Sequence, residues 1–171
     1  MKNEIQYTIG KSSLGSVLVA ENERGICAIS LGDSESALIS WLHTIFPTAV
    51  MRQENANFTD HLGEVLALVE SPHSEHHLPL DMRGTPFQQK VWNALREIKT
   101  GTTSTYSEIA ERINSPKAVR AVANACGANR LAIVIPCHRV IQKNGSLVGY
   151  RWGEERKREL LRRETETHLH S

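Results

Sequence analysis

The residues best suited to chemistry are Cys137 and His138, which follow Pro136 at the end of a short apolar run. A cysteine attacks carbon as its thiolate, and an adjacent imidazole or a cationic neighbour favours that form. Arg130 and Arg139 lie close by in the sequence. A cysteine after an apolar run is more often an inert buried thiol, but these neighbours predict a reactive nucleophile at Cys137.

The other cysteines, Cys27 and Cys126, lack such neighbours and are interpreted as buried, unreactive thiols. An odd set with no close pair argues against a disulfide framework and against a zinc site of the Cys-x-x-Cys type. His73, His76 and His77 come close together, but no fourth ligand with suitable spacing follows, so no metal site is expected. No stretch has the length and hydrophobicity of a membrane span, and we expect a cytosolic protein.

The formal charge of the chain is +1, but its two halves differ sharply. Residues 1–82 hold four basic against eleven acidic side chains, a net of −7, and residues 83–171 hold sixteen basic against eight acidic, a net of +8. We expect two domains with these bounds. The asymmetry predicts either a basic half that binds a polyanion or two independently solvated domains, and charge alone does not separate these alternatives.

The first half is predicted to be an α+β domain with a small sheet. Ile5–Thr8, Val17–Ala20 and Ile26–Leu31 are short β-prone runs separated by turn-like segments. Residues 71–86 carry several prolines and a glycine and are expected to be a linker. Two amphipathic helices are predicted between the strands and the linker, with buried stripes of Leu38, Trp41, Leu42 and Ile45 in one and Leu62, Val65, Leu66 and Val69 in the other.

The second half is predicted to be helical. Thr85 and Gln88 form a capping box around Pro86 and begin one helix, and a second capping box begins another at Thr105. A turn at Asn114 and a third helix over residues 117–126, capped by Ser115 and Pro116, complete a pattern typical of a helix-turn-helix.

The third helix is rich in alanine, and Lys117, Arg120 and Asn124 are expected to share one of its faces. Such a face could contact phosphates or base edges, whereas the alternative is an ordinary packed helix with a solvated outer side. The apolar run 131–135, which leads to Cys137, is expected to be a buried strand or extended segment. Residues 165–171 are expected to be disordered.

Several motifs, occurring in order, resemble those of the O6-alkylguanine-DNA alkyltransferases, and most of all the repair half of the bacterial Ada proteins. The active-site signature is Pro136-Cys137-His138-Arg139-Val140. The other matching segments are Arg-Gly-Thr-Pro-Phe-Gln (83–88), Thr-Tyr (105–106), Pro-Lys-Ala-Val-Arg-Ala-Val (116–122), Asn129, Gly-Tyr-Arg-Trp-Gly (149–153), and Arg-Lys and Leu-Leu-Arg-Arg-Glu (156–157 and 160–164). Residues 13–32 also look Ada-like, so the resemblance covers nearly the whole chain.

The resemblance implies a role for each matching residue of the site. Cys137 is the alkyl acceptor, His138 acts through a water molecule to deprotonate it, and Glu164 holds and polarises the imidazole. Asn129 bonds to backbone at the active-site turn. Tyr106 donates a hydrogen bond to the guanine ring as negative charge develops on the leaving base.

The resemblance also implies a DNA surface and a base pocket. Arg120 enters the duplex in place of the flipped nucleotide, and the other expected DNA-contacting residues are Lys117, Ala121 and Asn124. The expected pocket residues are Pro136, Val140, Cys126, Tyr150 and Arg151. Two residues depart from the family pattern in ways that bear on pocket width, since Arg130 stands where many members have proline and Arg151 where some have a small residue.

The implied function is repair of O6-alkylguanine, and of O4-alkylthymine, in double-stranded DNA by a minor-groove-binding helix-turn-helix that flips the damaged nucleotide. A thioether is a poor leaving group for water, so each protein is expected to act once. No cofactor is expected, since the thiolate supplies the bonding electrons. The resemblance further implies a ribonuclease-H-like sheet, a winged-helix-like second domain, a monomer and no membrane partner, in the bacterial cytoplasm.

Three rival functions are distinguished by the residues or by a single measurement. An alkyltransferase-like protein that binds lesions without repairing them would lack the acceptor, whereas Cys137 is present. A transcription factor would be expected to carry base-reading side chains in place of the alanines, and it leaves Cys137 and His138 unexplained. A cysteine hydrolase would turn over an acyl substrate repeatedly, which a turnover measurement distinguishes.

Overall fold

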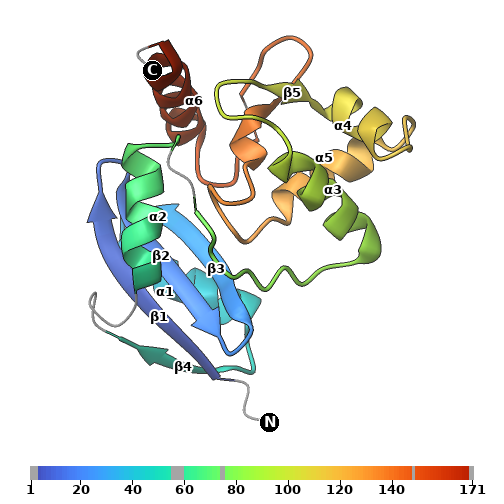
Figure 1. Cartoon of the computed structure of the whole chain (residues 1–171). Helices are drawn as coiled ribbons and strands as arrows, with labels where there is room; N and C mark the ends of the chain where they lie inside the picture. The colour runs from blue at the N-terminus through green and yellow to red at the C-terminus, as the bar shows by residue number, and fades with distance from the viewer. Residues whose placement is uncertain (1–3, 55–59, 74–75, 148, 170–171) are drawn as a thin grey trace. The chain divides into compact units, whose positions relative to one another are not determined.

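The computed structural model of the chain describes residues 4–54, 60–73, 76–147 and 149–169 (Figure 1). The chain divides into two compact units. Unit 1 comprises Met1–Glu70 and Ser74–Met82, and unit 2 comprises Ser71–His73 and Arg83–Ser171. The described part of the chain contains no helix with the length and hydropathy that crossing a membrane requires.

Unit 1 is built on a four-stranded sheet with the strand order β3-β2-β1-β4. The strands β1 (Glu4–Ser12), β2 (Gly15–Asn22) and β3 (Gly25–Gly32) form an antiparallel meander, and the edge strand β4 (Val50–Gln53) pairs with β1 in parallel. The three strands predicted from the sequence are therefore confirmed, whereas β4 was not predicted.

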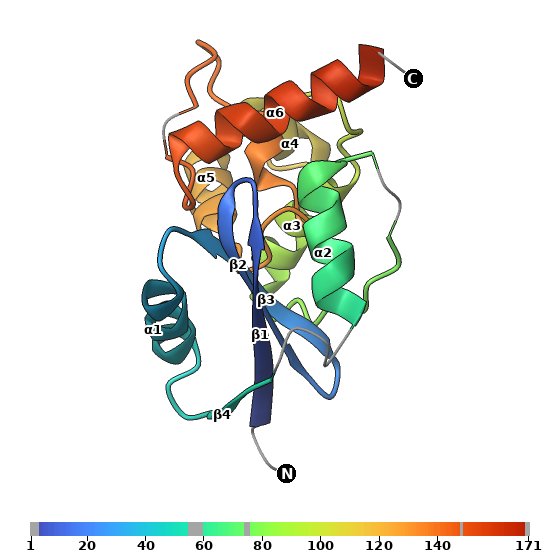
Figure 2. The same ribbon diagram turned by 90° about the vertical axis from the view of Figure 1, so that its left-hand side faces the viewer.

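Two helices cover opposite faces of this sheet, as Figures 1 and 2 show. Helix α1 (Glu35–Ile45) begins at Ser34, whose hydroxyl caps it, and packs Leu38 and Leu42 into the core. Helix α2 (Asp60–Glu70) lies against Gly10 of β1, where a larger residue would collide with the leucines of that helix. The predicted helices and the most buried residues of their apolar stripes are confirmed.

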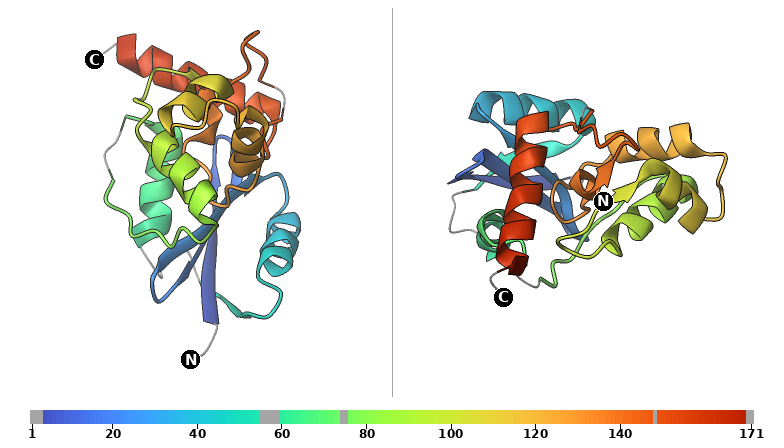
Figure 3. Two further views of the ribbon diagram at one scale, coloured as in Figure 1. Left: turned by 90° about the vertical axis from the view of Figure 1, so that its right-hand side faces the viewer. Right: turned by 90° about the horizontal axis from the view of Figure 1, so that it is seen from above.

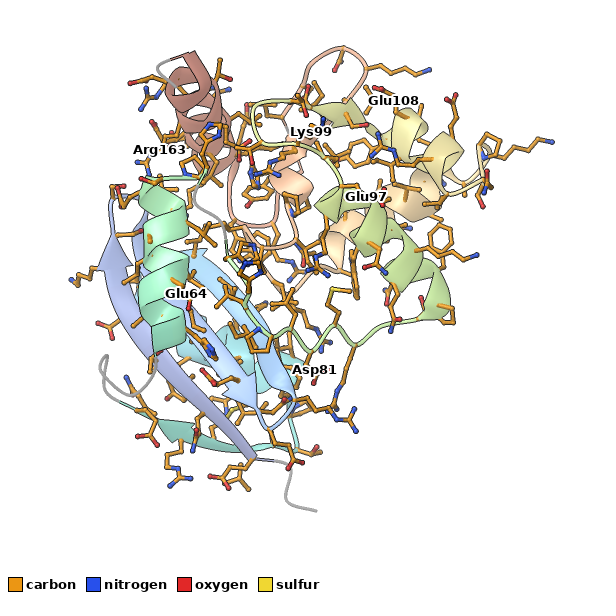
Figure 4. All side chains as sticks on the ribbon, in the orientation of Figure 1. Glu64, Asp81, Glu97, Lys99, Glu108 and Arg163 are labelled. Atoms are coloured by element: carbon orange, nitrogen blue, oxygen red, sulfur yellow. The ribbon has the colours of Figure 1, made fainter. Side chains whose placement is uncertain are left out.

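The expected linker is only partly a linker. Ile26 of β3 donates to the carbonyl of Pro79 and accepts from the amide of Asp81, both over 2.8 Å, so this segment extends the sheet edge. Asp81, labelled in Figure 4, also accepts a 2.7 Å hydrogen bond from Asn22. Gly25 has a φ of 146° and lies so close to Pro79 that a side chain there would collide with the backbone. Residues 79–81 are thus paired with β3 through two backbone hydrogen bonds.

Unit 2 contains the predicted helix-turn-helix. Its helices are α3 (Pro86–Arg96), α4 (Tyr106–Arg112) and α5 (Val119–Gly127). Both predicted capping boxes are present, at Thr85 with Gln88 and at Thr105 with Glu108, the latter labelled in Figure 4. Asn114 makes the turn after α4 with a φ of 63°, a conformation that asparagine tolerates better than most residues. The α+β class and the helical second half are therefore confirmed.

The start of the third helix differs from the prediction. Ser115 and Pro116 do not cap it; the Ser115 carbonyl instead accepts from the Ala118 amide over 2.9 Å, in a turn that precedes the helix. Helix α5 begins at Val119, after an N-cap residue with no side-chain capping bond. Lys117 therefore lies in this turn, ahead of the helix that carries Arg120 and Asn124.

A long C-terminal helix, α6 (Glu154–Leu169), was not predicted, and the disorder expected from residue 165 is wrong as far as residue 169. Residues 170 and 171 lie outside the described part of the chain. Figure 3 shows α6, in red, as one continuous helix. Ion pairs between residues one helical turn apart stabilise α6 on its exposed side. Arg158 pairs with Glu154, and Arg162 pairs with Glu159 and Glu166.

Candidate active site

Cys137 begins a single 3-10 turn, η1 (Cys137–Arg139), and its side chain is only 5% exposed. The preceding run of residues 131–135 is a tight buried turn, so the predicted strand is wrong. Within it, the Ile135 amide donates to the Leu131 carbonyl over 3.1 Å. Ile133 has a φ of 74°, which is a strained conformation for a β-branched residue and costs on the order of 1–3 kcal/mol.

The fully buried side chain of Asn129 holds this turn closed. Its Oδ1 accepts from the Leu131 amide over 2.8 Å, and its Nδ2 donates to the Ile135 carbonyl over 3.0 Å. The same Nδ2 lies 3.2 Å from Cys137 Sγ and donates to it. One amide therefore offsets the strain at Ile133 and positions the sulfur.

His138 and Glu164 form a buried pair, with 2.7 Å between His138 Nε2 and Glu164 Oε2. Arg139 binds the same carboxylate, with its Nε 3.0 Å from Oε1, and also donates to the Ile98 carbonyl. His73 Nε2 donates to the backbone carbonyl of Glu164 over 2.8 Å. His138 and Arg139 thus fix the carboxylate, and His73 holds the backbone that carries it.

The charges of this pair follow from its surroundings. Burial alone would raise the pKa of Glu164, but the hydrogen bonds and charges of His138 and Arg139 outweigh it and hold this pKa below its usual range. Burial lowers the pKa of His138 despite the carboxylate, so the imidazole is neutral at pH 7. A carboxylate only accepts, so Nε2 carries the ring hydrogen and Nδ1 presents a lone pair. Nδ1 is buried and has no hydrogen-bond partner among the described residues.

Tyr106 is brought to the site by a short parallel strand pair. Strand β5 (Ser104–Thr105) pairs with β6 (Val140–Ile141), which directly follows η1, and Tyr106 is the next residue after β5. Burial, with smaller contributions from Cys126 and Cys137, raises the pKa of Tyr106 to about 12. The phenol therefore keeps its hydrogen at neutral pH and can donate it.

Lys157 is the functional candidate that the sequence reasoning missed. It lies on α6 with 1% of its surface exposed, its Nζ donates to the Val140 carbonyl over 2.6 Å, and the same atom lies 5.8 Å from the centre of the Tyr150 ring. Burial lowers the pKa of Lys157, while the nearby thiols Cys137 and Cys126 raise it. Lysine is almost never fully buried without a partner, but no local sequence signal reveals that burial.

The thiol of Cys137 is not pre-ionised. Burial raises its pKa, and the hydrogen bond from Asn129 and the charges of Lys157 and Arg151 offset that only in part. Arg139, expected to favour the thiolate, is committed to Glu164. The expectation of a ready thiolate is therefore wrong for the resting protein, because burial outweighs the neighbouring cations.

Comparison with known families gives two matches, one for each half of the chain. A family described as "6-O-methylguanine DNA methyltransferase, ribonuclease-like domain" matches residues 5–82. The corresponding "6-O-methylguanine DNA methyltransferase, DNA binding domain" matches residues 86–166.

Individual relatives agree. The constitutive methylated-DNA–protein-cysteine methyltransferase of Bacillus subtilis is 40% identical over 144 residues, which cover 84% of this chain and 85% of that protein. The chain belongs to the 6-O-methylguanine DNA methyltransferase family. A member of the family from Escherichia coli, the bifunctional transcriptional activator/DNA repair enzyme Ada, is 53% identical over 162 residues. These cover 95% of this chain but 46% of Ada, so the chain spans about half the length of the Ada relatives that it matches.

Two solved structures have the same fold as this chain. The OGT protein of Mycobacterium tuberculosis, crystallised in complex with DNA, superimposes with a TM-score of 0.80 and 34% sequence identity, covering 94% of this chain and 93% of that one. The O6-methylguanine-DNA methyltransferase of Pyrococcus kodakaraensis, at 23% identity and a TM-score of 0.72, shares the fold.

In unit 2 a small cavity reaches Cys137. Of the expected pocket residues, Cys126, Tyr150 and Arg151 line it together with Cys137 and Tyr106, whereas Pro136 and Val140 do not. The remaining lining residues, which the sequence reasoning did not assign to the pocket, are Ala123, Gly127, Gly149 and Lys157. Within the described residues, no group of three or more His, Cys, Asp or Glu side chains is placed to hold a metal ion.

The residues expected to contact DNA lie on the surface of unit 2. Arg120, Ala121 and Asn124 are exposed on α5, and Lys117 is exposed in the turn before it. The inner side of α5 packs against α3, where Trp92 Nε1 donates to the Ala125 carbonyl over 2.9 Å. The helix therefore presents a polar outer face, and Ala123 on its flank lines the Cys137 cavity.

Proposed function

We propose that this protein repairs O6-alkylguanine in DNA by transferring the alkyl group to Cys137, irreversibly and once per molecule. The observation that carries the proposal is the arrangement of a buried Cys137 beside the His138–Glu164 pair, at a cavity lined by Tyr106. The family supports the same chemistry, since its curated members are named methylated-DNA–protein-cysteine methyltransferases.

The transfer begins with a proton. Neutral His138 has an Nδ1 lone pair with no hydrogen-bond partner among the described residues, and a water molecule could carry the Cys137 proton to it. Glu164 stabilises the resulting imidazolium, as a carboxylate does in other nucleophile–histidine pairs. The thiolate then attacks the alkyl carbon, the sulfur–carbon bond forms, and the bond from that carbon to guanine O6 breaks.

The electron pair of the broken bond moves to the guanine. The Tyr106 phenol, protonated because its pKa is about 12, donates a hydrogen bond to the ring as this charge develops. The base then takes up one proton, which balances the proton lost by Cys137. The thioether product is a poor leaving group for water, so the protein is consumed. O4-alkylthymine presents an equivalent alkyl carbon and is proposed as a second substrate.

The proposed substrate is a damaged base in double-stranded DNA, bound by unit 2 of a monomer. The exposed face of α5 supplies Arg120, Ala121 and Asn124, the turn before it supplies Lys117, and the domain that follows Met82 carries most of the positive charge. A nucleotide must be flipped to reach a buried sulfur, and Arg120 is proposed to fill its place. A DNA substrate would place the activity in the cytoplasm of a bacterium such as those that supply the Ada relatives.

The test is mass spectrometry of the full chain after mixing with duplex DNA that contains O6-methylguanine. We expect one methyl group per protein, mapped to the Cys137 peptide, and no transfer to Cys137→Ala. Cys27→Ala, which changes a buried thiol outside the cavity lining, serves as a matched control that remains active. Methyl groups on another cysteine, or repeated turnover as in a cysteine hydrolase, would contradict the proposal.

A further inference from the structure

Two free thiols border the cavity at the site. Cys137 on η1 and Cys126 on α5 are both buried, and both residues line it. The volume of the cavity is about 20 Å³, which is room for roughly one water molecule. Two residues that border so small a space lie close to one another. The fold therefore makes neighbours of two cysteines that are ten residues apart in the chain.

The side of α5 that carries Cys126 forms a wall of the cavity. Ala123, Cys126 and Gly127 all line it, because residues three and four apart share one side of a helix. Cys27 is also a buried thiol, but it packs in the core cluster of unit 1 and does not line the cavity. The sequence gives Cys27 and Cys126 the same interpretation, and the structure separates them.

Lys157, which also lines the cavity, brings one positive charge to both thiols. Burial is the main cause that raises the pKa of Cys126 and of Cys137, and the charge of Lys157 lowers both pKa values. Negative charge on Cys137 raises the pKa of Cys126 further. The two thiols therefore oppose each other's ionisation, and loss of the charge on Cys137 makes a thiolate at Cys126 easier to form.

Oxidation of Cys137 removes that charge. Hydrogen peroxide is little larger than the water molecule for which the cavity has room. Its oxygen–oxygen bond breaks as the Cys137 thiolate attacks, a sulfur–oxygen bond forms, and the products are an uncharged sulfenic acid and hydroxide. The Cys126 thiolate can then attack the sulfenic sulfur and expel a second hydroxide. The protons of the two thiols convert both hydroxides to water, so two thiols and one peroxide give one disulfide and two water molecules.

We propose that Cys126 is a resolving thiol, which captures a sulfenic acid at Cys137 as an intramolecular disulfide and so keeps the acceptor recoverable. A dithiol reductant restores both thiols of a disulfide, whereas it does not reverse the further oxidation of a sulfenic acid to a sulfinic acid. The benefit for repair rests on the proposed function, because a protein that acts once is lost if its acceptor is over-oxidised. The disulfide itself forms without any alkyl transfer.

The experiment treats the full chain with hydrogen peroxide in the absence of DNA, and then alkylates the remaining free thiols with iodoacetamide under denaturing conditions. Peptide mapping without reductant should find Cys126 joined to Cys137 within one chain, and Cys27 alkylated. Cys126→Ser cannot form this disulfide, so its Cys137 should accumulate as sulfinic acid. After dithiothreitol, the Cys137 thiol should be recovered in most of the unaltered protein and in about tenfold less of the Cys126→Ser variant.

Cys27→Ala is the matched control, since it removes a buried thiol outside the cavity lining and should still form the disulfide. Methyl transfer from duplex O6-methylguanine after dithiothreitol is expressed as a fraction of each variant's own activity before oxidation. Any direct effect of Cys126→Ser on the site then cancels. Recovery of activity should follow recovery of the thiol.

The unaltered chain alone can overturn the proposal, even if Cys126→Ser does not fold. Peroxide treatment that leaves no disulfide between Cys126 and Cys137 contradicts it, whether Cys137 is then a thiol or a sulfinic acid. Equal recovery of the Cys137 thiol in a folded Cys126→Ser protein contradicts it as well. A disulfide in a protein that transfers no methyl group would instead contradict the proposed function and leave the resolving thiol in place.

Discussion

His138 Nε2 lies 2.7 Å from Glu164 Oε2, and both side chains are 99% buried although 26 residues separate them in the chain. Arg139 binds the same carboxylate, and His73 binds the backbone carbonyl of Glu164. The carboxylate therefore sets the ring tautomer and leaves Nδ1 as the base. Orientation of a histidine by a buried carboxylate is a recurring device for activating a nucleophile.

The Glu164→Gln variant should slow methyl transfer by on the order of 10²-fold, because a neutral amide orients His138 poorly and cannot stabilise its imidazolium. The measurement is the single-turnover rate on saturating duplex, alongside the dissociation constant for DNA, which should stay unchanged. Glu159→Gln, the same change on the outer side of α6, should have little effect. Weaker DNA binding with a normal rate per bound complex would make Glu164 structural.

The Glu164→Ala variant addresses stability. Removal of the carboxylate leaves Arg139 without its ionic partner beside a buried histidine, and loss of one member of a buried pair costs about 3–5 kcal/mol. Because the pKa of Glu164 is depressed in the folded protein, its stabilising contribution is present above the unfolded carboxyl pKa. It is lost as the pH falls from there through the folded pKa. Urea unfolding at pH 7 and at pH 3 measures this, and the difference between variant and unaltered protein should be smaller at pH 3.

The rate at which iodoacetamide modifies Cys137 should depend on the charge of Lys157, which lowers the pKa of the thiol. Since burial raises the pKa of Cys137, its alkylation at pH 7 should be slower than that of free cysteine, and should increase with pH towards that raised pKa. Lys157→Met keeps much of the volume but removes a cation that lowers the pKa, so the profile should move to higher pH. Lys157→Met also leaves the Val140 carbonyl without its donor, which should cost on the order of 1–3 kcal/mol, so urea unfolding at pH 7 checks that the variant is folded. An unmoved profile would show that Lys157 only anchors the Val140 carbonyl.

The sequence predicts the elements whose signals are local. The capping boxes at Thr85 and Thr105 and the turn at Asn114 depend on a few neighbouring residues, and each was found where expected. Cys137 and His138 were predicted from their neighbours in the sequence, whereas the roles proposed for Glu164, Asn129 and Tyr106 followed from a family resemblance and could not be derived from spacing.

Two of the misses, helix α6 and the turn before Cys137, share a physical cause, which is a polar group buried by tertiary contacts. Helix α6 buries Lys157, Leu160 and Glu164 on one side, so two of the three core positions are charged and the apolar period is lost. The run before Cys137 has the composition of a strand, but the Asn129 side chain provides backbone partners that close it into a turn. Single-sequence patterns do not contain these contacts.

Asn129→Ala should be strongly destabilising. The variant loses three hydrogen bonds at a fully buried site and leaves the Leu131 amide and the Ile135 carbonyl without their partner, which costs on the order of 2–4 kcal/mol. Chemical unfolding measures the loss. Asn124→Ala, at an exposed position of α5, is the matched control and should lie within about 0.5 kcal/mol of the unaltered protein. A small effect at Asn129 would mean that the strained turn at Ile133 is held by its packing alone.

Arg120 and Lys117 should behave differently on DNA, although both are exposed cations at the same end of α5. Lys117, in the turn before the helix, is proposed to bind phosphate. Lys117→Ala should therefore weaken binding and make the log–log salt slope shallower by about 0.9. Repair at saturating protein should be little changed. The measurement is a titration of fluorescent duplex at several salt concentrations, with binding nearly independent of sequence.

Arg120 is proposed to occupy the space left by the flipped nucleotide, so its loss should affect the rate of repair more than affinity. Unstacking a base costs only a few kcal/mol, and Arg120→Ala should slow repair of a lesion in duplex while some activity persists. Free O6-methylguanine needs no flipping, and its reaction with Cys137 should be nearly unchanged. The two substrates are assayed side by side with Arg120→Ala and Lys117→Ala. An equal loss of rate on duplex and on free base would mean that Arg120 supports the fold or the thiolate. A residue that only replaces a flipped nucleotide in the base stack cannot slow the reaction of a free base, which has no stack to leave.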